Sequence, residues 1–213
     1  MRITCISALK IEISWLLGRL GKVSRTVGPI GPLWRGVFQS HEINCMLCGA
    51  GSEKCRQRLE RLDLSAGTEL IIHLGICGAL NPGLELGRPL LAETVKAAWA
   101  REEAPLALYL PEHLSYAELT PELIPLRGTI LTQRSRIESL RERQALRESF
   151  GAECVDQEAW EVARYCGSRN IPLIVVKAVS DRSDADLAAG FPERAARAAQ
   201  AAGKVVLSLL LDI

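Results

Sequence analysis

Residues 154–179, CVDQEAWEVARYCGSRNIPLIVVKAV, contain the pattern that decides the fold of this chain. Cys154–Asp156 predicts a short strand, Glu158–Arg169 predicts a helix, and Pro172–Val179 predicts an apolar strand rich in β-branched residues. A helix between two strands is the usual crossover between parallel neighbours of one sheet. The segment therefore predicts an α/β fold in which buried strands alternate with covering helices.

The same alternation continues over the rest of the chain. Further strands are expected at Arg2–Ser7, Leu33–Gln39, Ile43–Cys48, Leu70–Leu74, Pro89–Val95 and Gly128–Thr132. Further helices are expected at Ile11–Leu20, Glu53–Leu62, Ile137–Phe150 and from about Pro192 to Leu211. The stretch Ala97–Leu126 is irregular, and we interpret it as a long insertion that could cover a site. We predict one domain over residues 1–213, with three αβα layers around a twisted, mostly parallel sheet.

Composition and charge exclude several classes of function. Lys plus Arg total 26 and Asp plus Glu total 25, so the net charge of +1 gives no electrostatic footprint for nucleic acid. The longest later apolar run, Val205–Leu211, is far too short to span a membrane, and the first residues do not form a signal peptide. A cytoplasmic location is therefore expected. The seven cysteines are expected to be reduced core thiols, since Cys45-x-x-Cys48 lies inside a predicted strand without further zinc ligands.

Carboxylates follow three of the predicted strands. Glu12 follows the first strand, Asp156 and Glu158 follow Cys154–Asp156, and Asp181 follows the most apolar strand. Ligands bind beyond the carboxyl ends of strands in such sheets. Converging carboxylates suit cleavage of a glycosidic bond, where positive charge develops on a sugar and a proton must reach the leaving group. A single acidic residue is more often a helix cap or a surface ion pair, but three strand ends weaken that interpretation.

Two other motifs point to ligands less strongly. Asp181-x-x-Asp184-x-Asp186 lacks the glycine and terminal glutamate of an EF-hand loop, so no metal site is expected. Gly49-Ala-Gly51 leads into a helix that Ser52 could cap, and such a turn can hold an anion. It lacks the third glycine of a dinucleotide fingerprint and the Gly-Lys-Ser/Thr of a P-loop. No cofactor is therefore expected.

Five short motifs occur in order along the chain: residues 1–8 followed by Glu12, residues 48–52 (CGAGS), residues 75–87 (GICGALNPGLELG), residues 155–158 (VDQE) and residues 179–181 (VSD). In this order and spacing the chain resembles the purine nucleoside phosphorylase / methylthioadenosine–adenosylhomocysteine nucleosidase superfamily over nearly its whole length. The resemblance implies the fold of that superfamily, a homodimer, and a purine nucleoside as the small-molecule partner.

The resemblance also implies roles for particular residues. Asp181, oriented by Ser180, would protonate N7 of the purine, and Glu12 would position and deprotonate the attacking water. Glu158 would hold the ribose hydroxyls through charge-assisted hydrogen bonds. The remaining positions that the resemblance places against the substrate are Asp156, Gln157, Ile76, Cys77, Gly78 and Arg136. The implied reaction is hydrolysis of the N-glycosidic bond of a 5′-modified adenosine.

Three of these positions depart from the family pattern. Gln157 replaces the methionine that packs against the sugar, and Ile76 stands where the family commonly has a serine that contacts the nucleophile. Arg136 falls where nucleosidases often place the phenylalanine that stacks on adenine. Because a guanidinium also stacks on aromatic rings, purine binding is still expected, although the preferred base or 5′ group could differ.

Alternatives remain open on the same residues. The strand ends Ala8–Glu12 and Gly75–Ala79 contain no arginine, which favours water over phosphate as the nucleophile, but Arg134 or Arg136 could hold phosphate instead. Residues 132–158 also resemble a hopanoid-associated branch that is thought to act on a lipid-tailed nucleoside. In that case an apolar 5′ pocket could be lined by Trp99, Leu106, Leu108, Tyr109 and Leu110. Ordinary core and loop packing of these side chains is an equally good interpretation. The departures are also compatible with a non-catalytic nucleoside-binding protein.

Overall fold

The computed structural model describes residues 1–64, 67–111, 114–183 and 190–213. Within these ranges the sheet has ten strands: β1 (Arg2–Ser7), β2 (Gly21–Gly28), β3 (Gly31–Phe38), β4 (His41–Leu47), β5 (Leu70–Ala79), β6 (Pro89–Ala97), β7 (Leu106–Ala107), β8 (Leu126–Thr132), β9 (Cys154–Asp156) and β10 (Leu173–Asp181). The helices are α1 (Lys10–Leu17), α2 (Ser52–Leu59), α3 (Leu140–Phe150), α4 (Ala159–Gly167), α5 (Phe191–Asp212) and a short 3₁₀ helix, η1 (Pro121–Leu123).

The sheet consists of two parallel blocks. Strands β4, β1, β5 and β10 are parallel neighbours, and so are β6, β8 and β9. The blocks meet through the antiparallel pairs β10–β6 and β5–β9. Strands β2 and β3 extend the edge beyond β4 as antiparallel neighbours, and β7 lies against β6. The predicted α/β class is confirmed, and the parallel arrangement holds for the centre of the sheet while its edges are antiparallel.

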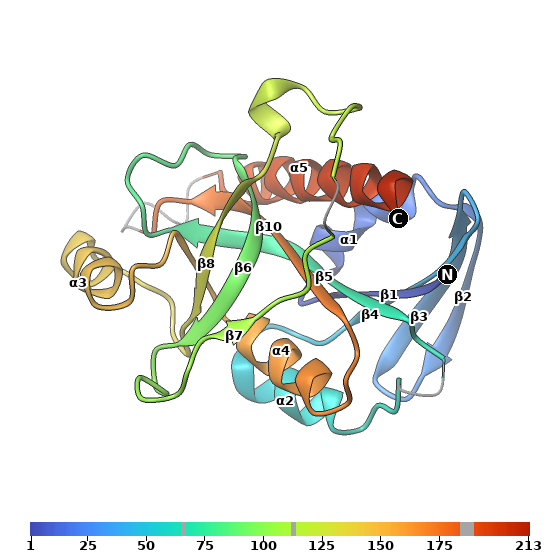
Figure 1. The fold of residues 1–213 in the computed structure, drawn as a ribbon, viewed down its shortest axis with the longest axis horizontal. Helices are drawn as coiled ribbons and strands as arrows, with labels where there is room; N and C mark the ends of the chain where they lie inside the picture. The colour runs from blue at the N-terminus through green and yellow to red at the C-terminus, as the bar shows by residue number, and fades with distance from the viewer. Residues whose placement is uncertain (65–66, 112–113, 184–189) are drawn as a thin grey trace.

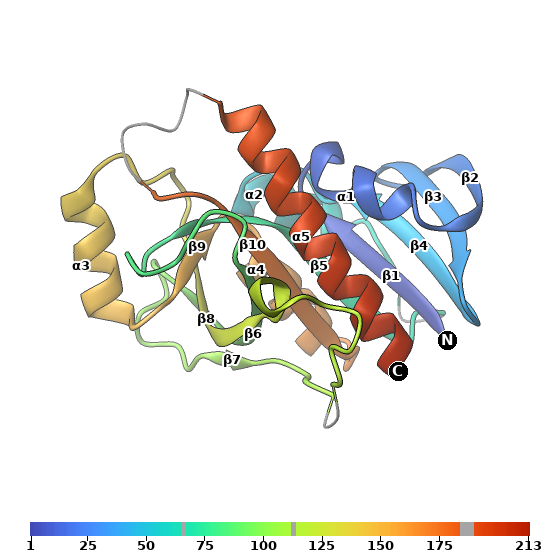
Figure 2. The same cartoon turned by 90° about the horizontal axis from the view of Figure 1, so that it is seen from above.

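Helices cover both faces of this sheet (Figure 1). Helices α1 and α5 pack on one face, and α2 and α4 pack on the other. Figure 2 shows α5 crossing the sheet diagonally above β5 and β10. The alanine-rich sequence of α5 buries many small side chains, which let the helix approach the strands closely. The predicted three-layer arrangement is therefore confirmed.

Strands β2 and β7 were not predicted, and three further details differ from the sequence-based expectation. Strand β5 continues through Gly75–Ala79, whereas the predicted strand ended at Leu74, because this segment pairs with β10 on one side and β9 on the other. Ser52 does not cap α2, since its hydroxyl donates to the carbonyl of Gln157 at 2.7 Å and Gly51 occupies the cap position. Helix α3 begins at Leu140, not at Ile137, with Ser139 accepting the Glu142 N–H.

The apolar residues form a core on each face of the sheet. All seven cysteines are buried thiols, as predicted. Burial raises the pKa of Cys166 to about 12, which keeps this thiol protonated near neutral pH. Across the described ranges, no helix combines the length and the apolar character needed to cross a membrane.

Candidate active site

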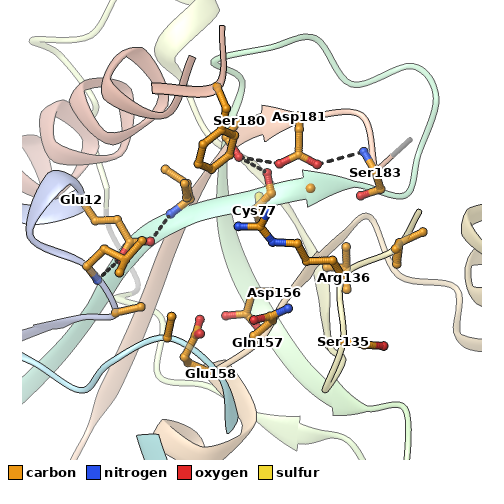
Figure 3. Close-up of a pocket in the computed structure, with 18 residues that line it drawn as sticks. Glu12, Cys77, Ser135, Arg136, Asp156, Gln157, Glu158, Ser180, Asp181 and Ser183 are labelled. Atoms are coloured by element: carbon orange, nitrogen blue, oxygen red, sulfur yellow. Dashed lines mark hydrogen bonds between the residues drawn. The ribbon is translucent and has the colours of Figure 1, made fainter. Parts of the chain in front are cut away.

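The strand-end carboxylates meet in one cavity (Figure 3). Glu12 enters it from the first turn of α1, Glu158 from the start of α4, and Asp181 from the end of β10. Every residue that the sequence placed against the substrate lines the same cavity: Glu12, Ile76, Cys77, Gly78, Arg136, Asp156, Gln157, Glu158, Ser180 and Asp181. The sheet brings these residues together because β5, β9 and β10 are neighbours whose functional ends share one edge.

Asp181 is held in a defined orientation at the end of β10. The Ser180 hydroxyl lies 2.7 Å from Asp181 Oδ2, and the Ser183 N–H donates to Oδ1 at 3.0 Å. Gly78 makes room for this arrangement, since a methyl group there would lie 2.9 Å from Asp181 Oδ1. The carboxyl group therefore faces the cavity in a single orientation, which suits proton donation to a bound ligand.

Glu12 is buried, with only 3% of its surface exposed. Its Oε2 accepts the Leu9 N–H at 2.7 Å, so the side chain reaches back to the N-terminus of its own helix. Its Oε1 accepts the Ile76 N–H from β5 at 3.1 Å. These two hydrogen bonds hold the carboxylate against the floor of the cavity, where it could deprotonate a water molecule.

Glu158 lies across the cavity from Glu12 and Asp181 (Figure 3). Its Oε1 accepts the Gly51 N–H at 2.6 Å, and Gly51 has a φ of +92°, a conformation that favours glycine. Burial and then the negative charge of Asp156 raise the pKa of Glu158 to about 7. The N–H of Gly51 therefore donates its hydrogen bond to the carboxylate of Glu158, and it is not free to bind an external anion.

Beneath the cavity lies a buried ion pair that sequence reasoning missed. Lys177 on β10 is fully buried, and its Nζ lies 3.0 Å from Asp156 Oδ2. Asp156 also accepts hydrogen bonds from the Thr132 hydroxyl and from the Ala159 N–H at the start of α4. The carboxylate of Asp156 therefore pairs with the Lys177 ammonium group and caps the first turn of α4. The sequence did indicate this ion pair: Lys177 lies inside an otherwise apolar strand, and a buried ammonium group needs a partner of opposite charge.

The cavity contains few positive charges. Arg136 is the one basic side chain among the described residues that line it, and it points toward the centre of the cavity (Figure 3). Its guanidinium carbon lies 5.7 Å from the centre of the Phe191 ring, which also lines the cavity. Arg134 instead stacks on Trp99 at 4.6 Å and does not line the cavity. A phosphate group therefore has one candidate arginine here.

The insertion at Ala97–Leu126 contributes none of its five apolar candidates to this cavity. Trp99, Leu106 and Leu108 pack against one core cluster, Leu110 packs against the other, and Tyr109 is exposed. Their contacts in the chain are those of ordinary loop packing. In the described ranges no group of three His, Cys, Asp or Glu residues could hold a metal ion. Asp184 and Asp186 lie outside the described residues.

Gly75 provides a test of this geometry. A methyl group at Gly75 would lie 2.6 Å from Glu12 Oε1 and 3.2 Å from Lys177 Nζ. Both groups are buried, so Gly75→Ala should displace Glu12 and lower base release by roughly one to two orders of magnitude, as expected for a misplaced general base. Steady-state kinetics and a thermal melt measure the effect.

Gly167→Ala is the matched control, because nothing lies within 4 Å of a methyl group there and the residue ends α4. This variant should keep full activity and gain up to about 1 kcal/mol of stability. Equal activity of the two variants would contradict the close packing of Gly75 against Glu12.

Comparison with known proteins gives a consistent result. A sequence model of the phosphorylase superfamily matches residues 2–211. A 5'-methylthioadenosine/S-adenosylhomocysteine nucleosidase of Staphylococcus aureus (strain bovine RF122 / ET3-1) is 26% identical, with 98% of both chains covered. The S-adenosylhomocysteine nucleosidase from Streptococcus pyogenes, in complex with 5-methylthiotubericidin, is 20% identical with a TM-score of 0.84, covering 100% of this chain and 97% of that chain. The futalosine hydrolase of Helicobacter pylori strain 26695 is also 20% identical, with a TM-score of 0.82 and coverage of 100% and 98%.

Proposed function

The chain belongs to the phosphorylase superfamily, and on this basis we propose that it is a nucleosidase that hydrolyses the N-glycosidic bond of a purine nucleoside and releases the free base. The observation that carries the proposal is the cavity that holds Glu12, Glu158 and Asp181 together. The three carboxylates come from three different elements and have different hydrogen-bond partners, so they can take different roles in one reaction.

The proposed reaction begins with the base. Asp181 in its acid form donates a proton to N7 of the purine, and Ser180 and Ser183 hold the carboxyl group in place. The electron pair of the C1′–N9 bond then passes to the base, which leaves as a neutral molecule. Positive charge develops on the ribose, and ionised Glu158 holds the ribose hydroxyls more tightly as this charge grows.

Glu12 completes the reaction. It accepts a proton from a water molecule while the water oxygen forms the new bond to C1′. The hydrogen bonds from Leu9 and Ile76 to Glu12 supply the fixed position that this step requires. The product is a free sugar, and Glu12 and Asp181 return to their starting states by exchanging protons with solvent.

The charge of the cavity supports water as the nucleophile. A phosphate dianion would enter beside Glu12, Glu158 and Asp181 with Arg136 as its cation among the described lining residues. The negative charges of the phosphate and of the carboxylates would repel each other strongly in a buried site of low dielectric. Phosphorolysis is therefore the second candidate, and it depends on Arg136 alone among the described lining residues.

The substrate that we propose is a 5′-modified adenosine. The apolar side chains of Ala8, Leu9, Ala50 and Phe191 line the cavity and could contact an uncharged 5′ group. The names of the relatives support this class, since the Staphylococcus aureus protein is a 5'-methylthioadenosine/S-adenosylhomocysteine nucleosidase. A single domain, a homodimer and a cytoplasmic location stay predictions.

A nucleoside panel tests the function. Methylthioadenosine, adenosylhomocysteine, adenosine, inosine, a futalosine-type nucleoside and a lipid-tailed adenosine are incubated with the enzyme, with and without phosphate, and the free base and sugar are measured. We expect base release from at least one 5′-modified adenosine, with free sugar as the product in both buffers. Ribose 1-phosphate that appears with phosphate would identify a phosphorylase. Tight binding without turnover across the panel would identify a nucleoside-binding protein.

A further inference from the structure

Lys177 is the buried cation nearest to the proposed chemistry. It stands on β10 opposite Gly75 of β5, inside a strand whose other side chains are mostly apolar. Burial alone would lower its pKa, but the carboxylates of Asp156, Glu12 and Glu158 raise the pKa above the usual value for lysine. The side chain is therefore an ammonium group on which the charges of three carboxylates act.

Asp156 pairs with this ammonium group, and His73 lies beside the same carboxylate. Asp156 Oδ2 lies 3.0 Å from Nζ, and the same oxygen lies 3.8 Å from His73 Nε2. His73 pairs with Val175 in the parallel register, so its side chain lies on the same face as that of Lys177. Burial and then the charge of Lys177 lower the pKa of His73, which favours the neutral imidazole.

The hydrogen bonding of His73 determines which of its two ring nitrogens carries the proton. Nδ1 lies 3.0 Å from the Ile6 carbonyl, and a carbonyl oxygen only accepts, so Nδ1 carries the proton. Nε2 is then a lone-pair acceptor, and it has no hydrogen-bond partner in the part of the chain that the structure describes. A lone pair beside Asp156 Oδ2 is repelled unless a donor lies between them, and Lys177 is the cation beside both groups.

The remaining side of the ammonium group faces the cavity floor. Lys177 Nζ and Glu12 Oε1 both lie against Gly75, since a methyl group there would touch both of them. Glu158 is the other carboxylate whose charge acts on Lys177. Among the described residues, the titratable groups around Lys177 are His73 and Cys77 from β5, Asp156 from β9, Glu158 from the start of α4 and Glu12 from α1.

We propose that Lys177 is a positioning residue for the reaction, anchored by Asp156, and that its ammonium group balances the negative charge of Glu12 and Glu158 in the buried cavity. This inference rests on the proposed function. Its physical reason is that two carboxylates cannot both stay charged in an enclosed site without a nearby cation. The neutral His73 and the charged Asp156 leave that cation available to the cavity.

The experiment compares Lys177→Gln, which keeps a hydrogen-bond donor toward Asp156 but removes the charge, with Lys177→Arg, which keeps the charge. The titration of Glu158 is followed by carbon-13 NMR of labelled glutamate, with Glu158→Gln for assignment, and kcat and KM are measured across pH. In the native protein Glu158 should titrate at about 7. In Lys177→Gln the titration and the acid limb of kcat/KM should move together to higher pH by about one unit, which lowers kcat/KM roughly fivefold at pH 7, where Glu158 of the native protein is half protonated. In Lys177→Arg the acid limb of kcat/KM should stay at the native pH, because the positive charge is retained.

Thr132→Val is the matched control, because it leaves every charge in place while it removes the hydrogen bond to Asp156 and the acceptor of the Trp160 N–H. It should lower the melting temperature without moving the titration of Glu158. If the role of Lys177 were purely structural, Lys177→Gln would also lower the melting temperature without moving the titration of Glu158. An acid limb of kcat/KM that stays at the native pH in Lys177→Gln would therefore overturn the proposal.

A second variant covers the case in which Lys177→Gln does not fold with an unpaired Asp156. Asp156→Asn/Lys177→Gln removes both members of the buried ion pair, so Asp156 is not left as an unpaired charge and the fold should be retained. The proposal expects kcat to stay roughly tenfold or more below the native value, because Glu12 still lacks its cation; native kcat in this folded variant would overturn it. The NMR titration needs no turnover, so failure of the proposed function on the nucleoside panel is seen separately from failure of this charge balance.

Discussion

Asp181→Asn should lower the rate of purine release by about three orders of magnitude, within the range of a lost general acid. The asparagine amide has the shape of the carboxyl group and still accepts the Ser183 N–H through its oxygen. Its amide N–H can form a hydrogen bond to N7 but is too weak an acid to transfer the proton, so the base must leave as an anion. We expect kcat to fall while KM changes little, because the hydrogen bonds of Glu158 to the ribose are unaffected.

The leaving group provides the sharpest check on this prediction. A 4-nitrophenyl riboside releases a stable anion without protonation, so Asp181→Asn should cleave it at nearly the native rate while purine release is lost. Asp212→Asn is the control for the substitution itself, since that carboxylate bonds Ser115 at the far end of α5 and should leave both rates unchanged. Equal losses on both substrates would show that Asp181 acts through the fold or through binding and not as the acid.

Glu12→Gln should have the second-largest effect, a loss of about two orders of magnitude in kcat, within the range expected for a lost general base. The amide keeps one oxygen for either the Leu9 or the Ile76 N–H but turns a donor toward the other. A cost of about 1 kcal/mol in stability should accompany the loss of that bond. The loss in rate is far larger than this cost explains, because the amide cannot accept the proton of the attacking water.

Glu153→Gln is the matched control for Glu12→Gln. Glu153 is a carboxylate outside the cavity that accepts a hydrogen bond from the Asn81 amide at 2.6 Å, so its loss should leave kcat unchanged. Phosphate should not restore the rate of Glu12→Gln. Recovery in phosphate buffer would mean that phosphate, and not water, attacks C1′, and would favour the phosphorylase alternative.

Much of the fold was predictable because each central strand is buried and carries a local signal. The apolar run before Asp181 predicts β10, and the alternation of strands and helices predicts the layers. Strand β2 was missed because nearly all its residues are exposed at the sheet edge, so its sequence has no apolar alternation. The extension of β5 through Gly75–Ala79 was missed because glycine disfavours strands in general, and pairing on both sides overrides that preference here.

Hydrophobic periodicity and chain order are local properties, and they were sufficient to predict that Glu12, Glu158 and Asp181 follow strands of one α/β sheet. Tertiary structure alone decided that Lys177 reaches Asp156 and that Asp156 lies beside His73. These residues come from β5, β9 and β10, and their contacts depend on strand order and register. A pattern along the chain contains no distance between such strands, so the buried cation beneath the cavity became visible only in the folded protein.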